Sequence, residues 1–264
     1  MADPVLVNFI QKVPLYLREG PWTLAAHIYL VYFMIFLLLT FPYALRSYSS
    51  TSSSSSHFKR EEESRSGFVG YYRGLGALYC LSICMYVYIK VGLWPFITYT
   101  ITSWNLLTLR LVSSSLQNYS SLFRAISRFL RFPALAGTTV TFTIWWLVLF
   151  PLIYTASDTA HRKQFLEFNA SFLLINIHLL NMPICAMEFL LSGVRLTYFD
   201  LYIGFVVALA YMLFYLNVLD PRGVHLYIIL TPRTSFCVVN YSLVLLVYVA
   251  CYYGWNAVLT STPQ

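Results

Sequence analysis

The chain has 264 residues, of which 59% are hydrophobic and 10% are charged, and its formal net charge is +7. Because soluble domains carry about a quarter charged residues, this composition excludes a soluble globular protein and predicts an integral membrane protein. The basic residues are spread over loops instead of forming a dense tract, so we expect contact with membrane lipids and no binding of nucleic acid.

Hydropathy along the chain predicts an all-α, polytopic bundle of transmembrane helices. A span needs roughly 20 apolar residues. By that measure we expect about seven spans, at residues 23–45, 74–93, 96–116, 135–155, 168–192, 198–217 and 236–259. The second and third spans meet at Trp94-Pro95, a tight re-entry, and six spans is the alternative count.

Composition divides the chain into four parts: an interfacial N-terminal segment (1–22), an extra first span (23–45), a Ser-rich charged loop (46–73) and a six-span bundle (74–264). The stretch SYSSTSSSSSHFKREEESRSG in this loop is of low complexity and would be disordered alone. We therefore expect the first span and the loop over residues 46–67 to be where a protein partner could bind.

A second interfacial segment is expected at LQNYSSLFRAISRFLRF, residues 116–132. Arg124, Arg128 and Arg131 recur at helical spacing on one face, while apolar residues cover much of the rest. This pattern is typical of a helix that lies at the lipid headgroups. Pro133 is expected to end it.

The fifth predicted span contains the stretch INIHLLNMPICAMEFLLSG, in which His178, Asn181, Cys185 and Glu188 stand out. At 100° per residue these four side chains fit an arc of about 80°. Ionisable groups in a membrane face another helix or a water-filled cavity. We expect this face to be buried, with Glu188 neutralised by Arg110 or Arg195.

The third predicted span, FITYTITSWNLLTLRLVSSS, carries a comparable polar arc made of Thr98, Thr102, Asn105 and Ser113. Hydrogen bonds between helices would explain such residues in a membrane. Thr102 and His178 lie at similar depths, about 9 and 15 Å into their spans. A hydroxyl and an imidazole that meet there would form the minimal nucleophile and base pair.

Three stretches resemble the androgen-induced family of membrane proteins and the related rolling stone proteins. In IHLLNMPICAME, His178 is followed by Pro183 and Glu188 at the spacing of the family's His-containing helix. In YTITSWNLLTL, Thr102-Ser103-Trp104 stands where rolling stone members have Thr-Asn-Trp. HLYIIL (225–230) is similar to the family's Trp-x-Tyr-Pro-Phe-Leu segment, keeping Tyr227 and Leu230 but lacking the Trp and the Pro.

The resemblance covers about residues 70 to 255 and implies an intramembrane threonine hydrolase of fatty acid esters of hydroxy fatty acids. It implies Thr102 as the nucleophile, His178 as the base, and an endomembrane of the ER type. Around this pair we expect a supporting polar face made of Thr98, Asn105, Asn181, Glu188, Arg110 and Tyr227. Glu188 cannot orient His178, because ten residues of helix separate the two by about 15 Å.

A different class of function stays open, in which the chain is a non-catalytic accessory subunit of a larger membrane complex. A mitochondrial inner-membrane assembly is one example, in which the chain keeps the fold with or without a bound lipid. The extra first span, the altered segment around Tyr227 and the many aromatic residues (22 Tyr, 20 Phe and 6 Trp) favour this interpretation. For neither class do we expect a cofactor or a metal site, since the five cysteines form no Cys-x-x-Cys pair.

Overall fold

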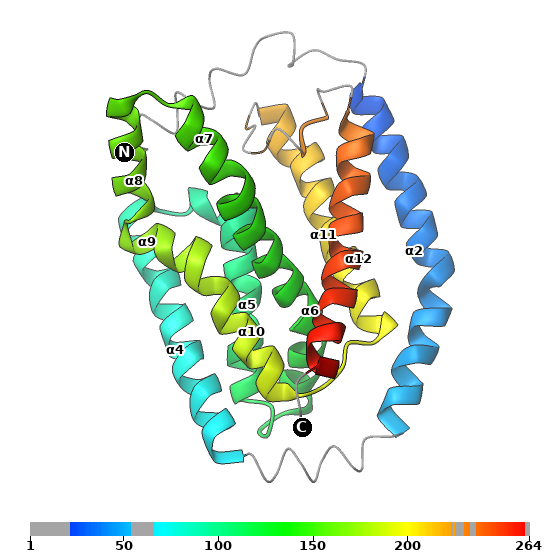
Figure 1. Ribbon diagram of the computed structural model, residues 1–264. Helices are drawn as coiled ribbons and strands as arrows, with labels where there is room; N and C mark the ends of the chain where they lie inside the picture. Colours follow the sequence, from blue (N-terminus) through cyan, green and yellow to red (C-terminus); the bar gives the residue numbers. More distant parts are fainter. Residues whose placement is uncertain are drawn as a thin grey trace. The chain divides into compact units, whose positions relative to one another are not determined.

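The computed structural model describes residues 22–53, 66–222, 224, 227, 230–232 and 236–261. The regular elements in this part of the chain are all helices, which confirms the predicted all-α class (Figure 1). The predicted N-terminal interfacial segment and residues 54–65 of the Ser-rich loop lie outside the described residues.

Each of the seven predicted spans is helical. They correspond to α2 (Trp22–Ser53), α4 (Ser66–Val91), α5 (Tyr99–Ser115), α6 with α7 (Ser121–Thr143, Phe150–Ala156), α9 with α10 (Phe172–Leu174, Asn181–Ser192), α11 (Tyr198–Phe214) and α12 (Cys237–Ser261). A short 3₁₀ turn, η2 (Trp94–Ile97), makes the predicted re-entry before α5. Asp158 caps α8 (Thr159–Asn169), which is polar and connects α7 to α9.

Six of the helical stretches in the described residues are long and apolar enough to cross a membrane, as expected of a multi-pass membrane protein. They are Trp22–Ser49, Gly67–Val91, Ser121–Ala156, Phe172–Ser192, Tyr198–Arg222 and Cys237–Ser261. The remaining predicted span, α5, has 17 residues. At 1.5 Å per residue it is about 25 Å long, short of the roughly 30 Å hydrocarbon core.

Three of these long helices contain a π-helical stretch: η3 (Ile144–Leu149), η4 (Ile175–Leu180) and η5 (Tyr215–Leu219). A fourth short element, η6 (Asp220–Arg222), is a 3₁₀ turn that follows η5. π-Helical turns insert one residue into a helical turn and are frequent at functional sites. The first two π stretches, η3 and η4, contain residues of the candidate site.

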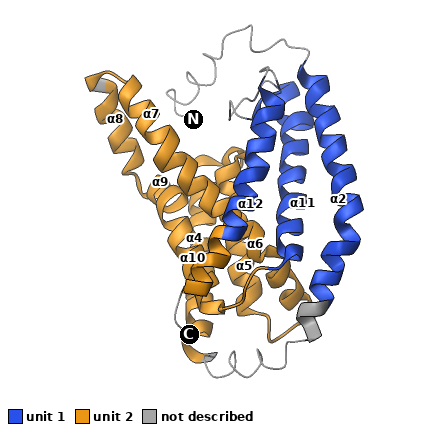
Figure 2. Ribbon diagram, turned by 45° about the vertical axis from the view of Figure 1, so that its right-hand side comes forward, with its two compact units in different colours: residues 1–50, 197–253 blue, residues 51–196, 254–264 orange. Residues whose placement is uncertain are grey.

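The chain divides into two compact units, each described by itself. The first comprises residues 1–50 and 197–253 and contains most of α2, α11 and the first part of α12 (Figure 2). Phe33 packs edge-on against Phe205, with ring centroids 5.7 Å apart. The Ser242 hydroxyl donates to the Tyr29 hydroxyl at 3.0 Å, so α2 is joined to both helices by aromatic and polar contacts.

The second unit comprises residues 51–196 and 254–264 and holds the candidate site. Its centre is α5, which contacts both α4 and α6. Trp104 is fully buried and its indole N–H donates to the Cys80 carbonyl of α4 at 3.2 Å. On the α6 side, the Thr141 hydroxyl donates to Ser103 Oγ at 3.3 Å. These contacts fix the position of α5 along both neighbours.

The expected helix end at Pro133 is wrong, because α6 continues through Pro133 to Thr143. Phe132, Pro133 and Ala134 are buried, so packing of this segment outweighs the hydrogen bond that proline removes. The predicted interfacial segment and the fourth span are thus one stretch of 36 residues. Its length of about 54 Å exceeds the hydrocarbon core, which leaves room for an end at the headgroups.

The three arginines of that end do not enter the core. Arg124 is exposed and donates to the Gln117 carbonyl at 3.4 Å, while Arg128 and Arg131 are half-buried. Arg131 donates to the Arg195 carbonyl at 3.1 Å. Their location at the membrane surface stays a prediction. The predicted loop 46–73 is also shorter than expected, because α2 continues to Ser53 and α4 begins at Ser66.

We predict that Gly137→Ala destabilises the protein and that Gly74→Ala does not. A Cβ atom at Gly137 would lie 2.9 Å from Ser103 Oγ and 3.2 Å from Ser103 Cβ, whereas nothing lies within 4 Å of one at Gly74. Overpacking costs about 1–3 kcal/mol, and alanine is preferred over glycine in a helix. Thermal unfolding of both variants in one detergent measures the difference; equal midpoints would contradict the packing of α5 on α6.

Candidate functional site

The polar stripe predicted on the fifth span is buried, as expected. His178, Asn181, Cys185 and Glu188 are each less than 9% exposed. His178 lies in η4 and the other three lie in α10, and both elements contact α5. The stripe therefore faces protein in the second unit.

Glu188 forms the predicted ion pair with Arg110. The Arg110 Nη2 to Glu188 Oε1 distance is 3.0 Å, and the carboxylate also accepts from Arg73 Nε at 3.2 Å through both oxygens. All three side chains are buried. Arg73 was not predicted, because hydropathy places it in the loop 46–73, whereas it lies on the second turn of α4.

The ion cluster of Arg73, Arg110 and Glu188 extends to α6 through serine hydroxyls. Arg110 Nη1 donates to the Ser127 backbone carbonyl and, at 2.6 Å, to Ser127 Oγ. Ser127 Oγ in turn lies 2.9 Å from Ser114 Oγ of α5. The cluster thus connects four helices, α4, α5, α6 and α10.

His178 has an aromatic environment. Its imidazole stacks on the indole of Trp145, with ring centroids 4.0 Å apart and ring planes 20° apart. Trp146 Nε1 donates to the His178 backbone carbonyl at 2.9 Å, one of the carbonyls in the π turn. Buried polar atoms in proteins are usually hydrogen-bonded, yet His178 Nδ1 is buried without a hydrogen-bond partner in the described part of the chain.

Neighbouring amides hold this region in place. Asn169 Oδ1 accepts from the Trp145 indole at 2.9 Å, and Asn169 Nδ2 donates to the Phe165 carbonyl at 2.7 Å. Asn176 accepts from the Tyr79 hydroxyl of α4. Asn181 is satisfied within its own helix, through the Ile177 carbonyl and the Met182 N–H.

Thr102 is half-buried, and its hydroxyl donates to the Thr98 carbonyl at 2.8 Å. No hydrogen bond joins Thr102 to His178 in the described residues. The expected packing of α5 against the His178 segment is present, whereas the facing of the two side chains stays a prediction. The sequence therefore predicts that α5 packs against the segment of His178. It does not define a contact between the Thr102 hydroxyl and the imidazole.

The rest of the polar arc on α5 makes fewer bonds between helices than expected. Thr98 accepts from the Ile101 N–H as the helix cap, and Ser113 Oγ is buried without a partner. Counting described residues, Asn105 alone of the four bonds to another helix, since its Oδ1 accepts from Cys84 Sγ at 3.4 Å. Hydrogen bonds between helices come instead from Ser103, Trp104 and Arg110.

Tyr227, the last residue of the predicted supporting face, belongs to the first unit. Its backbone carbonyl accepts from the Tyr215 hydroxyl at 3.2 Å and from the Leu230 N–H at 3.1 Å. The structure therefore gives Tyr227 a role in its own unit, beside the π stretch η5.

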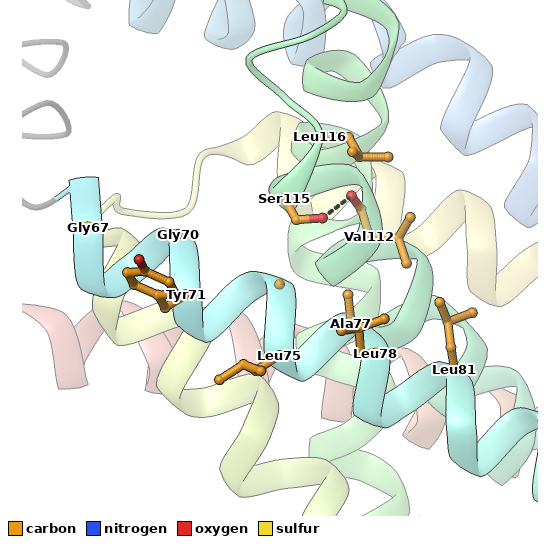
Figure 3. A pocket seen from close by; sticks show the side chains of 11 residues that line it. Gly67, Gly70, Tyr71, Leu75, Ala77, Leu78, Leu81, Val112, Ser115 and Leu116 are labelled. Carbon is orange, nitrogen blue, oxygen red and sulfur yellow. Dashed lines mark hydrogen bonds between the residues drawn. The ribbon is translucent and has the colours of Figure 1, made fainter.

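An open cavity of about 660 Å³ lies between α4 and α5, away from these residues (Figure 3). Its lining includes Gly67, Gly70, Gly74 and three leucines of α4, together with Val112, Ser115 and Leu116 at the end of α5. The Ser115 hydroxyl donates to the Val112 carbonyl at 2.8 Å and so presents little polarity. The lining is apolar and includes neither Thr102 nor His178.

No protein-family model matches the chain, and comparison with characterised proteins and with solved structures gives no match either. The candidate site is therefore described by its own geometry.

We predict that Glu188→Ala strongly destabilises the protein, because two buried guanidinium groups lose their shared carboxylate. Breaking a buried ion pair from one side costs about 3–5 kcal/mol. Glu167→Ala is the matched control, since Glu167 is exposed on α8. The midpoint of thermal unfolding and the yield of monodisperse protein in detergent measure the effect. A Glu188→Ala variant as stable as the control would show that the cluster contributes little.

Proposed function

We propose that the chain is an integral membrane hydrolase of lipid esters, with Thr102 as the nucleophile and His178 as the general base. The observation that carries the proposal is the unpartnered, buried Nδ1 of His178, in a π turn that contacts the helix of Thr102. A base must be able to accept a proton, and a ring nitrogen without a bonded donor is available for this role.

The reaction consumes one ester and one water and yields one acid and one alcohol. Thr102 Oγ1 attacks the ester carbonyl carbon while His178 takes the hydroxyl proton. The tetrahedral intermediate expels the alkoxide, which takes that proton and leaves as the alcohol. Water then attacks the acyl-threonine, with His178 again as the base, and releases the acid and free Thr102.

One rearrangement precedes the attack. The Thr102 hydroxyl donates to the Thr98 carbonyl, so it must rotate about χ1 to direct its hydrogen toward His178. Threonine in a helix populates two χ1 rotamers, one of which bonds a preceding carbonyl. Rotation between them releases the hydroxyl without any movement of α5.

The resemblance to the androgen-induced and rolling stone proteins supports the proposal at Thr102, His178, Pro183 and Glu188. Here Glu188 is neutralised by Arg73 and Arg110. This structural role gives a physical reason for a glutamate ten positions after His178. The resemblance also favours an endomembrane of the ER type as the location.

A second candidate is the accessory subunit, in which the Thr102 hydroxyl keeps its bond within α5. It is also consistent with α2, which exposes Leu24, Tyr32, Leu38 and Leu39 by 66–76%. Lipid or another membrane subunit could cover that face, and a mitochondrial inner-membrane complex is one such setting.

We predict that Thr102→Ala and His178→Ala each lower the turnover of a long-chain p-nitrophenyl ester by at least about 100-fold. The double variant should lose little more than either single one, because the two residues act as a unit. Thr108→Ala is the matched control, since Thr108 donates to the Trp104 carbonyl at the same 2.8 Å and the same spacing.

A fluorophosphonate probe tests the same point without a chosen substrate. The parent protein and Thr108→Ala should be labelled, and the Thr102→Ala and His178→Ala variants should not. Absence of labelling in the folded parent, together with no ester turnover, would favour the accessory subunit.

A further inference from the structure

Among the residues that the structure describes, His178 lacks the acidic partner that usually orients a catalytic base. A base is commonly held by a third group that fixes its ring, and a carboxylate on the imidazole nitrogen is the usual form. Glu188 is committed to Arg73 and Arg110, and His178 Nδ1 has no hydrogen-bond partner. Some other contact must therefore set the plane of this ring.

The Trp145 indole is the contact that can do so. The χ2 torsion of histidine is broad and roughly two-fold, so packing decides where the ring lies. A stack at 4.0 Å between centroids and 20° between planes covers one face of the imidazole. Proton transfer takes place at the ring edge, where Nδ1 has no hydrogen-bond partner among the described residues.

The indole is itself fixed by a hydrogen bond. Trp145 Nε1 donates to Asn169 Oδ1 at 2.9 Å, and Asn169 is held by the Phe165 carbonyl at 2.7 Å. Asn169 is only 5% exposed. A chain of contacts thus runs from α8 through the side chain of Trp145 to the face of His178.

We propose that Trp145 and Asn169 are positioning residues for His178: Asn169 fixes the indole, and the indole fixes the imidazole. This inference rests on the proposed function and deepens it. The indole face has a second effect, because His178 becomes positively charged when it takes the proton of Thr102. A cation over the face of tryptophan is attracted by the ring quadrupole, so Trp145 stabilises the charged form of the base.

The proposal is tested with variants that separate the ring face from the N–H bond. Trp145→Leu removes both, Trp145→Phe keeps a ring without the N–H donor, and Asn169→Leu removes the acceptor. Asn169→Asp keeps an acceptor oxygen. Trp255→Phe is the matched control, since Trp255 also donates its indole N–H, to Thr139 Oγ1 at 3.1 Å, and packs edge-on against Phe189.

In ester turnover, Trp145→Leu should lower kcat by about 10–100-fold with KM nearly unchanged, since a misplaced base slows the chemical step. Trp145→Phe and Asn169→Leu should show smaller and similar losses, and their combination should cost no more than either one. Asn169→Asp should restore most of kcat. Additive losses, or an equal loss in Trp255→Phe, would overturn the positioning role.

A second measurement does not depend on turnover. Diethyl pyrocarbonate modifies neutral imidazole, and mass spectrometry of the folded protein gives the modification rate at His178. We expect faster modification in Trp145→Leu and an unchanged rate in Trp255→Phe. If the parent hydrolyses no ester while this difference is seen, the hydrolase proposal fails and the ring contact stands. If the parent is active but neither kcat nor the rate changes in Trp145→Leu, the positioning proposal fails alone.

Discussion

The second unit depends on the buried ion cluster of Arg73, Arg110 and Glu188. An unpaired charge that is buried in protein costs several kcal/mol, so none of these buried side chains would be stable there alone. The shared carboxylate, with distances of 3.0 and 3.2 Å, makes the three tolerable only together. Because the residues come from α4, α5 and α10, and Arg110 also bonds to Ser127 of α6, the cluster permits one relative register of these four helices.

That register has consequences for His178, which lies on the continuous helix that ends with α10. Holding Glu188 against Arg110 directs the same stripe of the helix toward α5 over its whole length, so Asn181 and His178 are buried as well. The Glu188 carboxylate is bound to Arg73 and Arg110 and does not contact the imidazole of His178. The imidazole is left among aromatic rings and amides, on a π turn whose carbonyl at His178 accepts from Trp146 instead of remaining unsatisfied. Order in the site comes from ring packing, not from charge.

Local patterns were sufficient for what periodicity and length determine. The apolar runs predict the seven helical segments. The polar arc predicts the buried stripe, and the free-energy cost of an unpaired charge predicts the ion pair of Glu188 with Arg110. Contacts between distant segments escaped this reasoning. The charged residues before Arg73 predict a loop there, and a proline at position 133 predicts a helix end. The burial of Phe132, Pro133 and Ala134 is a tertiary effect that no local pattern contains. The sequence does not predict a role for Trp145, since an indole among apolar residues is typical of packing in a membrane helix. Its contact with His178 appears only in the structure.

The two proposed functions make different demands on the same histidine. Hydrogen bonds from threonine to a preceding carbonyl do not discriminate between them, because Thr108 makes the same bond as Thr102. The two histidines in predicted spans differ in their hydrogen-bond partners. His27, in the first unit, has oxygen partners at both ring nitrogens, the Thr23 carbonyl at 2.8 Å and Asn217 Oδ1 at 3.3 Å, as expected of a residue that joins helices. His178 has an aromatic neighbour but no partner for Nδ1. A ring nitrogen without a partner is consistent with the proposed base, which must be able to accept a proton.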